Sequence, residues 1–217
     1  MMIASRHGNT PVKKGDKLAG TRIIPLVIEK EKMHKAAAIC ADGPILELKE
    51  FHKKKVGIIT TGNEVYHKRI EDTFTPVIKE KLAEYDTEVI YHEIFDDNHE
   101  KITKGCLTAI EKGADLVICT GGMSVDPDDK TPLAIKNTGA EIVSYGAPVL
   151  PGAMFLLSYY KNDIPILGLP GCVMYAKRTI FDLVLPRIMA NDKITAEELA
   201  SLGEGGLCLS CPVCTFP

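Results

Sequence analysis

The sequence lacks the patterns that would place it among membrane, secreted or nucleic-acid-binding proteins. No uninterrupted apolar run approaches the ~18 residues that a membrane-spanning helix needs. The first residues lack the long apolar stretch of a signal peptide. The formal net charge is -3, so the basic excess typical of nucleic-acid binding is missing as well. We therefore expect a cytoplasmic protein that binds neither a membrane nor a nucleic acid.

Common catalytic signatures are also missing. The six histidines show no close spacing of the kind that metal ligands have, and they are expected to be surface or packing residues. The sequence contains no nucleophile elbow, no Walker loop and no Ser-His-Asp arrangement. The function has to be inferred from loop composition instead.

The composition is that of an ordinary globular protein with a sizeable core. The chain has 217 residues, of which 45% are hydrophobic and 25% charged, which fits one full domain with appendages. We expect residues 1–52 to be a connecting segment or the remnant of an upstream domain, residues 53–191 the main domain, and residues 192–217 a helix with a Cys-rich tail. Within the first segment, the pattern predicts strands at 23–28 and 45–48 and a helix over 29–40.

From residue 56 onward, strand-like and helix-like segments alternate. The apolar runs predict strands at 56–60, 88–94, 115–120, 142–145, 154–157 and 164–169. Helix starts are indicated by Thr75-Pro76, Asn98 and Thr131-Pro132, and a last long helix is predicted from about 173 to 189. This alternation predicts an α/β fold, a three-layer α/β/α arrangement around a doubly wound, mostly parallel sheet.

Ligands of such sheets bind beyond the carboxyl ends of the strands, where three loops stand out. The first strand runs into Thr61-Gly62-Asn63-Glu64, the third into a loop from Thr120 to Thr131, and the last into Pro170-Gly171. Each loop places glycine where a ligand must approach the backbone closely, and each leads towards a helix N-terminus, which favours anions. Taken one at a time, such loops are ordinary tight turns; together they predict a site for a phosphorylated small molecule.

The loop after the third strand also carries an acidic run. Asp126, Asp128 and Asp129 are open to two interpretations, a solvated group that caps the next helix or a set of ligands for magnesium. Magnesium bridges carboxylates and phosphates and would offset their mutual repulsion. Glu64 in the neighbouring loop is either a further ligand or a residue that orients the substrate.

These motifs resemble, in order, those of the molybdopterin-binding domain family. The matching residues are Thr61-Gly62-Asn63-Glu64, Thr120-Gly121-Gly122-Met123-Ser124-Val125 with Asp128-Asp129-Lys130-Thr131, Pro151-Gly152, and Gly168-Leu169-Pro170-Gly171. The family includes molybdopterin adenylyltransferases (MogA-type), molybdopterin molybdenumtransferases (MoeA-type), the gephyrin domains and the competence-damage (CinA-type) proteins. The resemblance covers roughly residues 53–190.

The resemblance implies roles for particular residues. It implies a pterin phosphate ligand, a magnesium ion, and association as a dimer or trimer. Asp129 and Glu64 are implied as catalytic and magnesium-binding residues. The implied ligand-binding residues are Thr61, Gly62, Asn63, Thr120, Gly121, Gly122, Met123, Ser124, Asp128, Thr131, Pro151, Gly152, Pro170 and Gly171.

Two positions depart from the pattern of the molybdenumtransferases. Ala153 stands where that branch usually has lysine after Pro-Gly, and Val173 stands where proline usually begins the helix. Three functions therefore stay open: a molybdopterin-binding protein with adenylyl transfer or molybdate insertion, a competence-damage-type hydrolase of nucleoside pyrophosphates, and a non-enzymatic pterin or metal sensor or delivery protein.

The sequence contains seven cysteines. Cys40, Cys106, Cys119 and Cys172 lie in apolar segments and are expected to be small buried residues. Cys208, Cys211 and Cys214 form a C-x-x-C-x-x-C run at the end of the sequence. That spacing is typical of zinc or iron–sulfur ligands, although both usually take four, and a flexible cysteine tail is the alternative.

Overall fold

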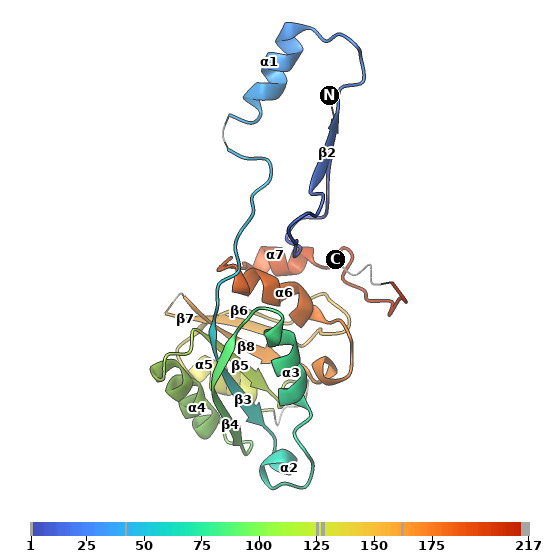
Figure 1. The fold of residues 1–217 in the computed structure, drawn as a ribbon. Helices are drawn as coiled ribbons and strands as arrows, with labels where there is room; N and C mark the ends of the chain where they lie inside the picture. Colours follow the sequence, from blue (N-terminus) through green and yellow to red (C-terminus); the bar gives the residue numbers. More distant parts are fainter. Residues whose placement is uncertain (1, 42, 125, 127–128, 162, 214–217) are drawn as a thin grey trace. The chain divides into compact units, whose positions relative to one another are not determined.

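The computed structural model describes residues 2–41, 43–124, 126, 129–161 and 163–213. The chain divides into two compact units, residues 1–50 (unit 1) and residues 51–217 (unit 2). Figure 1 shows the helices and strands of both units along the chain.

Unit 1 is a hairpin and a helix without an interior. Strands β1 (Met2–Ser5) and β2 (Ala19–Arg22) pair antiparallel, and helix α1 spans Lys30–Ala38. Not one of the described residues of unit 1 is buried. Helix α1 confirms the predicted helix over 29–40, but both predicted strands are wrong. Residues 23–28 follow β2 outside any strand, with a bend at 25–27 that contains Pro25, which cannot donate to a ladder. Residues 45–48 form no strand either.

Unit 2 contains a six-stranded sheet in the order β4-β3-β5-β8-β7-β6. Its strands are β3 (Lys55–Thr61), β4 (Glu88–Phe95), β5 (Leu116–Thr120), β6 (Glu141–Tyr145), β7 (Leu156–Tyr160) and β8 (Ile164–Leu169). Strands β4, β3, β5 and β8 are mutually parallel, whereas β7 is antiparallel to both of its neighbours. The predicted mostly parallel α/β sheet is confirmed.

Helices cover both faces of this sheet and make it a three-layer domain (Figure 1). On one face, α3 (Phe74–Ala83) and α6 (Ile180–Met189) pack over the side chains of Ile58, Ile118 and Leu167. On the other face, α4 (His99–Glu111) and α5 (Thr131–Asn137) pack over Ile59, Val117 and Cys119. The alternation of β3 side chains between the two cores follows from the two-residue period of a strand. The remaining short elements are α2 (Asn63–Tyr66), the 3-10 helix η1 (Gly171–Met174) and α7 (Ala196–Ser201).

The structure corrects the predicted final helix. Instead of one helix from 173 to 189, η1 ends at Met174 and α6 begins only after Thr179. Thr179 and Asp182 form a capping box, in which each side chain binds the other's main-chain N–H, so the chain starts a new helix there. Strand β7 likewise begins two residues later than the predicted strand at 154–157.

Two helix starts differ in the residue that caps them. Asn98 caps α4 as expected, accepting hydrogen bonds from Glu100 N and Lys101 N. Helix α3, however, is capped by the Asp72 carboxylate, which accepts from the N–H groups of residues 74 and 75, and not by the Thr75 hydroxyl. Among the described residues, no helix is long and apolar enough to cross a bilayer.

Candidate functional site

The loops that follow β3 and β5 are joined by hydroxyl groups. Thr61 Oγ1 lies 3.1 Å from Thr131 Oγ1, and Thr131 Oγ1 donates to the Gly121 carbonyl over 2.8 Å. Because β3 and β5 are adjacent parallel strands, their carboxyl ends meet at one edge of the sheet. The structure thus brings together three of the residues that the sequence predicted for the site.

Gly121 and Gly122 are required by this close approach. Both have positive φ, 82° and 54°, a region that other residues rarely adopt. A Cβ on Gly121 would lie 2.1 Å from the Thr61 carbonyl oxygen, and one on Gly122 would lie 2.9 Å from Thr131 Oγ1. The β5 loop can therefore pack against the β3 loop only with glycine at these positions.

Asp129 closes the β5 loop upon itself. Its Oδ2 accepts hydrogen bonds from Ser124 N at 2.6 Å and from Ser124 Oγ at 2.8 Å. The hydroxyl of Tyr145, on β6, donates to the Ser124 carbonyl, and burial, followed by the negative charge of Asp129, raises the pKa of Tyr145. Tyr145 is therefore protonated and able to donate at neutral pH. Asp126 and Asp129 are joined through their main chains, and Asp128 lies outside the described residues.

Two further residues of the β5 loop point into the protein. Thr120 is fully buried at the end of β5, and its Oγ1 has no hydrogen-bond partner among the described residues. Met123, predicted to bind the ligand, is also buried, with its thioether against Gly168. Its side chain fills the space that the missing side chain of Gly168 leaves.

The first loop is arranged around Asn63. Asn63 N donates to the carboxylate of Asp97, and Asp97 N donates to Asn63 Oδ1, which ties the loop to the end of β4. Gly62 has a φ of 138° and precedes this turn. Glu64 is exposed on α2, and its carbonyl accepts from the N–H groups of residues 69 and 70.

The two Pro-Gly pairs lie at the start of η1 and beside α6. Pro170 precedes η1, which begins at Gly171. The Pro151 carbonyl accepts from Ile180 N, and a Cβ on Gly152 would lie 2.4 Å from Ile180 Cγ2. Gly152 is therefore a packing requirement at the N-terminus of α6.

A cavity of about 260 Å³ lies on this side of the site. Pro151 forms part of its wall together with Lys177 and Arg178, which lie between η1 and α6. The Gly121-Gly122 loop does not line it. The cations are in a position to attract anions towards the Pro-Gly side of the site.

The expected metal sites are not complete in the part of the chain that the structure describes. There, no group of three or more His, Cys, Asp or Glu side chains could hold a metal ion. Asp128 and Cys214 lie outside the described residues, so magnesium at Asp129 and Glu64 stays a prediction.

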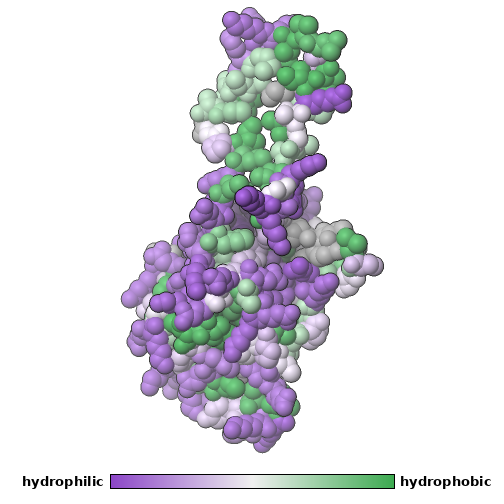
Figure 2. Space-filling model, in the orientation of Figure 1, coloured by the Kyte–Doolittle hydropathy of each residue, from purple (hydrophilic) through white to green (hydrophobic). Residues whose placement is uncertain are grey.

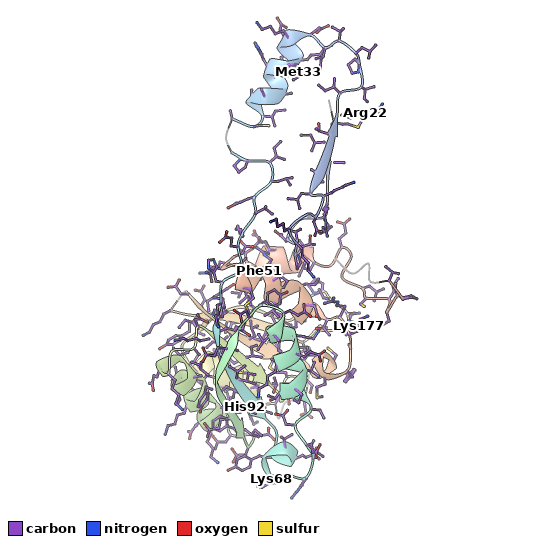
Figure 3. The ribbon with its side chains drawn as sticks, in the orientation of Figure 1. Arg22, Met33, Phe51, Lys68, His92 and Lys177 are labelled. Carbon is purple, nitrogen blue, oxygen red and sulfur yellow. The ribbon has the colours of Figure 1, made fainter. Side chains whose placement is uncertain are left out.

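The structure adds a polar cluster that the sequence reasoning missed. His92 Nε2 lies 3.2 Å from Thr60 Oγ1 and 3.1 Å from Thr75 Oγ1, and Thr75 Oγ1 donates to Asp72 Oδ2 over 2.5 Å. Burial lowers the pKa of His92, with Asp72 opposing and Lys79 adding to the effect. This polar cluster (Thr60, Asp72, Thr75 and His92) lies at the end of β3, on the face of α3. Figure 3 labels His92 on β4.

The cysteines expected in the interior divide into two groups. Cys106 and Cys119 are buried with their sulfur atoms 3.5 Å apart, as expected of packing residues. Cys172 is half-buried, and Cys40 is exposed, so the expectation for Cys40 is wrong. Cys40 follows α1 in unit 1, which has no interior to receive it.

A mostly parallel sheet with helices on both faces and glycine loops at its carboxyl edge defines an α/β domain of the doubly wound class. Residues 57–190 match the model of a family described as a probable molybdopterin binding domain, and the chain belongs to this family. The molybdopterin biosynthesis enzyme MoaB of Thermus thermophilus is similar in structure, with a TM-score of 0.52 and 25% identity over 64% of this chain and 98% of that one.

Two curated relatives extend the comparison. A molybdopterin molybdenumtransferase of Haemophilus influenzae is 30% identical over 186 residues, which are 82% of this chain and 43% of the relative. A Bacillus velezensis protein of the competence-damage inducible class is 36% identical over 85 residues, which are 39% of this chain and 20% of the relative. The chain thus spans less than half the length of either relative.

Proposed function

We propose that the chain binds molybdopterin, or its adenylylated form, at the carboxyl ends of β3, β5 and β8. The observation that carries the proposal is the adjacency of these three parallel strands, which makes neighbours of the loops at Thr61, Gly121 and Pro170. Hydroxyl groups, main-chain N–H groups and the nearby cations are the donors that a phosphorylated pterin needs.

The residues present fit such a ligand. The Gly121-Gly122 loop is shaped without side chains, and the buried Thr120 hydroxyl beside it has no partner among the described residues. In the proposed arrangement Thr120, Gly121, Gly122 and Ser124 hold the pterin and its phosphate. Asp129 positions this loop through Ser124.

Catalysis is the finer part of the proposal. Asp129 and Glu64 are the residues that would hold magnesium, which would neutralise the substrate phosphates and so support adenylyl transfer or molybdate insertion. Ala153 supplies no positive charge after Pro151-Gly152, and Val173 supplies no proline after Pro170-Gly171. We therefore propose that these two substitutions affect turnover more than binding, which makes a cytoplasmic sensor or delivery protein the non-enzymatic form of the same function.

A second candidate function is hydrolysis of a nucleoside pyrophosphate such as ADP-ribose. The observation in its favour is the 36% identity to the protein of the competence-damage inducible class. The same anion-binding loops and the same acidic pair, Asp128 and Asp129, would serve this reaction.

We also propose a dimer or trimer, which light scattering of the purified chain measures directly.

Calorimetric titration with molybdopterin, with and without magnesium, tests the proposal. We expect micromolar or tighter binding by the unaltered chain and a loss of about tenfold or more in Asp129→Ala, because the loop opens without its acceptor. Asp163→Ala is the matched control, since this exposed aspartate directly precedes β8 and so lies at the opposite edge of the sheet.

The outcomes separate the three functions. Binding with magnesium-dependent turnover establishes the enzyme, and equally tight binding without turnover establishes the sensor or delivery protein. Turnover of ADP-ribose without pterin binding establishes the hydrolase. No binding by the folded, unaltered chain contradicts the proposal as a whole.

A further inference from the structure

The C-terminal segment from Gly205 to Cys211 (the thiol segment) is anchored through its main chain. Leu207 forms a parallel bridge with Leu150. Leu150 N donates to the Gly206 carbonyl, and Cys208 N donates to the Leu150 carbonyl, both over 2.8 Å. Cys208 therefore stands on a backbone that is held against the rest of unit 2.

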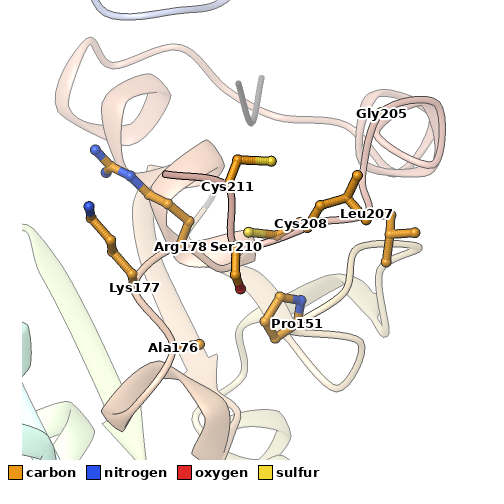
Figure 4. A pocket seen from close by; sticks show the side chains of 10 residues that line it. Pro151, Ala176, Lys177, Arg178, Gly205, Leu207, Cys208, Ser210 and Cys211 are labelled. Carbon is orange, nitrogen blue, oxygen red and sulfur yellow. The ribbon is translucent and has the colours of Figure 1, made fainter. Parts of the chain in front are cut away.

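The thiol segment forms one side of the cavity of about 260 Å³, and both of its cysteines line that cavity (Figure 4). Cys208 and Cys211 are free thiols, the first half-buried and the second exposed. Ser210 between them has a φ of 53°, which turns the chain and lets both side chains reach the same cavity. A reagent in the cavity can therefore meet two thiols.

Two thiols are what the described part of this segment supplies, and two is the number that a disulfide needs. Cys208 and Cys211 have the C-x-x-C spacing that is typical of thiol–disulfide exchange sites. The exposed thiol of Cys211 is the one that a reagent from solution reaches first. The anchored Cys208 is then in a position to complete the bond.

The cavity wall also carries positive charge, which indicates the kind of reagent. Lys177 and Arg178 lie on the wall with the two cysteines (Figure 4). Arg178 donates to the Asp182 carboxylate over 3.2 Å, so part of its charge is offset, and Lys177 is the cation to test. Positive charge at a cavity attracts small anions. Disulfides of the glutathione type carry carboxylates and are suited to such a wall.

We propose that Cys208 and Cys211 are a reversible dithiol–disulfide site that exchanges with an anionic low-molecular-weight disulfide of the glutathione class. Cys211 loses its proton to water and attacks one sulfur of the reagent, whose S–S bond breaks and releases one glutathione thiolate. Cys208 likewise loses its proton and attacks the Cys211 sulfur of the mixed disulfide, which releases the second glutathione thiolate. Each released thiolate takes up one proton. Two protein thiols are thus oxidised to one disulfide, and one glutathione disulfide is reduced to two glutathione molecules.

The other described cysteines are not placed for this reaction. The sulfur atoms of Cys106 and Cys119 lie 3.5 Å apart, but both are buried in the core beneath α4 and α5, away from reagents in solution. Cys172 is half-buried, and burial raises the pKa of its thiol, which disfavours the reactive thiolate. Cys40 is exposed, but it is the one cysteine in the sequence of unit 1, so its reaction ends at a mixed disulfide.

Incubation of the reduced Cys40→Ser chain with glutathione disulfide, without oxygen, tests the proposal. Peptide mapping by mass spectrometry should find a bond between Cys208 and Cys211, and dithiothreitol should reverse it. In the same background, Cys208→Ser should stop at a mixed disulfide on Cys211. Cys211→Ser should leave the thiol at residue 208 largely unmodified over the same time. Circular dichroism confirms that each variant is folded.

The charge of the reagent is tested by a second pair of variants. Lys177→Gln should slow the reaction with glutathione disulfide about twofold or more, but not the reaction with uncharged 2-hydroxyethyl disulfide. Lys104→Gln is the matched control, since this exposed lysine lies on α4, on the other face of the sheet, and it should change neither rate. Equal rates for Lys177→Gln and the unaltered chain would overturn the assignment of an anionic reagent.

Two results of the mapping would overturn the disulfide itself. One is the absence of a bond between Cys208 and Cys211 in the folded chain under excess glutathione disulfide. The other is a bond from Cys211 to Cys214, which lies outside the described residues, in place of the bond to Cys208. Neither result bears on the pterin site, because this proposal does not depend on it.

Discussion

The two units of the chain contain similar elements but differ in what lies beneath them. Unit 1 has two strands and a helix, yet its large apolar side chains, among them Ile24, Leu26 and Val27, are exposed. Figure 2 shows such apolar side chains at the surface of unit 1. Unit 2 has a core on each face of its sheet. Hydrogen-bonded secondary structure therefore does not by itself provide a hydrophobic interior, and the stability of the chain comes from unit 2.

Truncating one large side chain in each unit tests this difference most strongly. Phe155 is fully buried in unit 2, and Phe155→Ala should lower the free energy of unfolding by about 3–5 kcal/mol. Leu26 is fully exposed in unit 1, and Leu26→Ala should change it by no more than about 0.5 kcal/mol. Urea unfolding followed by circular dichroism measures both. A large loss in the Leu26 variant would show that unit 1 is covered in solution.

Replacing glycine in the two units should give a smaller contrast. Gly121→Ala forces a positive φ on alanine and a clash with the Thr61 carbonyl, and we expect a loss of about 2–4 kcal/mol. A Cβ on Gly8 would meet nothing within 4 Å, so Gly8→Ala should stay within about 0.5 kcal/mol. Thermal unfolding measures the pair. Equal stability of the two variants would contradict the packing described for the β5 loop.

Hydroxyl groups allow a finer comparison. Thr120→Val removes a buried hydroxyl that lacks a partner, and should stabilise unit 2 by about 1 kcal/mol. Thr21 is exposed in unit 1, where its hydroxyl donates to the Met2 carbonyl, and Thr21→Val should have an effect of no more than about 0.5 kcal/mol. Denaturant midpoints measure these changes. A loss of stability in Thr120→Val would mean that the hydroxyl has a partner in solution.

The smallest effect is a pH dependence that arises in unit 2. The pKa of His92 is lowered in the folded state, so below about pH 6.5 the unfolded chain binds the proton more readily. The free energy of unfolding should therefore decrease as the pH falls through this range. The slope against pH should be smaller than the slope that uptake of one whole proton on unfolding would give. His92→Gln should flatten this part of the curve. Melting temperatures between pH 5.5 and 7.5 measure the effect, and identical curves for both proteins would exclude it.

The sequence predicted the features that depend on neighbouring residues. Asn98 and the glycines of the β5 loop could be assigned because a cap or a positive φ is a local requirement. The order of the strands then brought the predicted loops to one edge. The broken final helix was missed because Val173, Ala176, Ile180 and Leu183 keep a helical spacing across the capping box of Thr179 and Asp182.

Features that depend on distant residues could not be predicted. The polar cluster combines Asp72 with His92 from the next strand, and no spacing indicates that contact. Its local signal was an aspartate three residues before Thr75, which is typical of helix caps. The cavity at Pro151 arises because residues from Gly205 onward return to Leu150, a contact that only the folded chain shows.

The strand order also has a consequence for the newly synthesised chain. Strand β5 can pair with β3 as soon as it leaves the ribosome, but its other neighbour, β8, begins only at Ile164. Until then the apolar edge of β5 is open to pairing with other chains, a known source of aggregation. The hairpin of β7 and β8 joins strands that are close in sequence and forms without a crossover, so it completes the sheet quickly once it is made. A chaperone or slow translation would therefore matter most between the synthesis of Thr120 and that of Ile164.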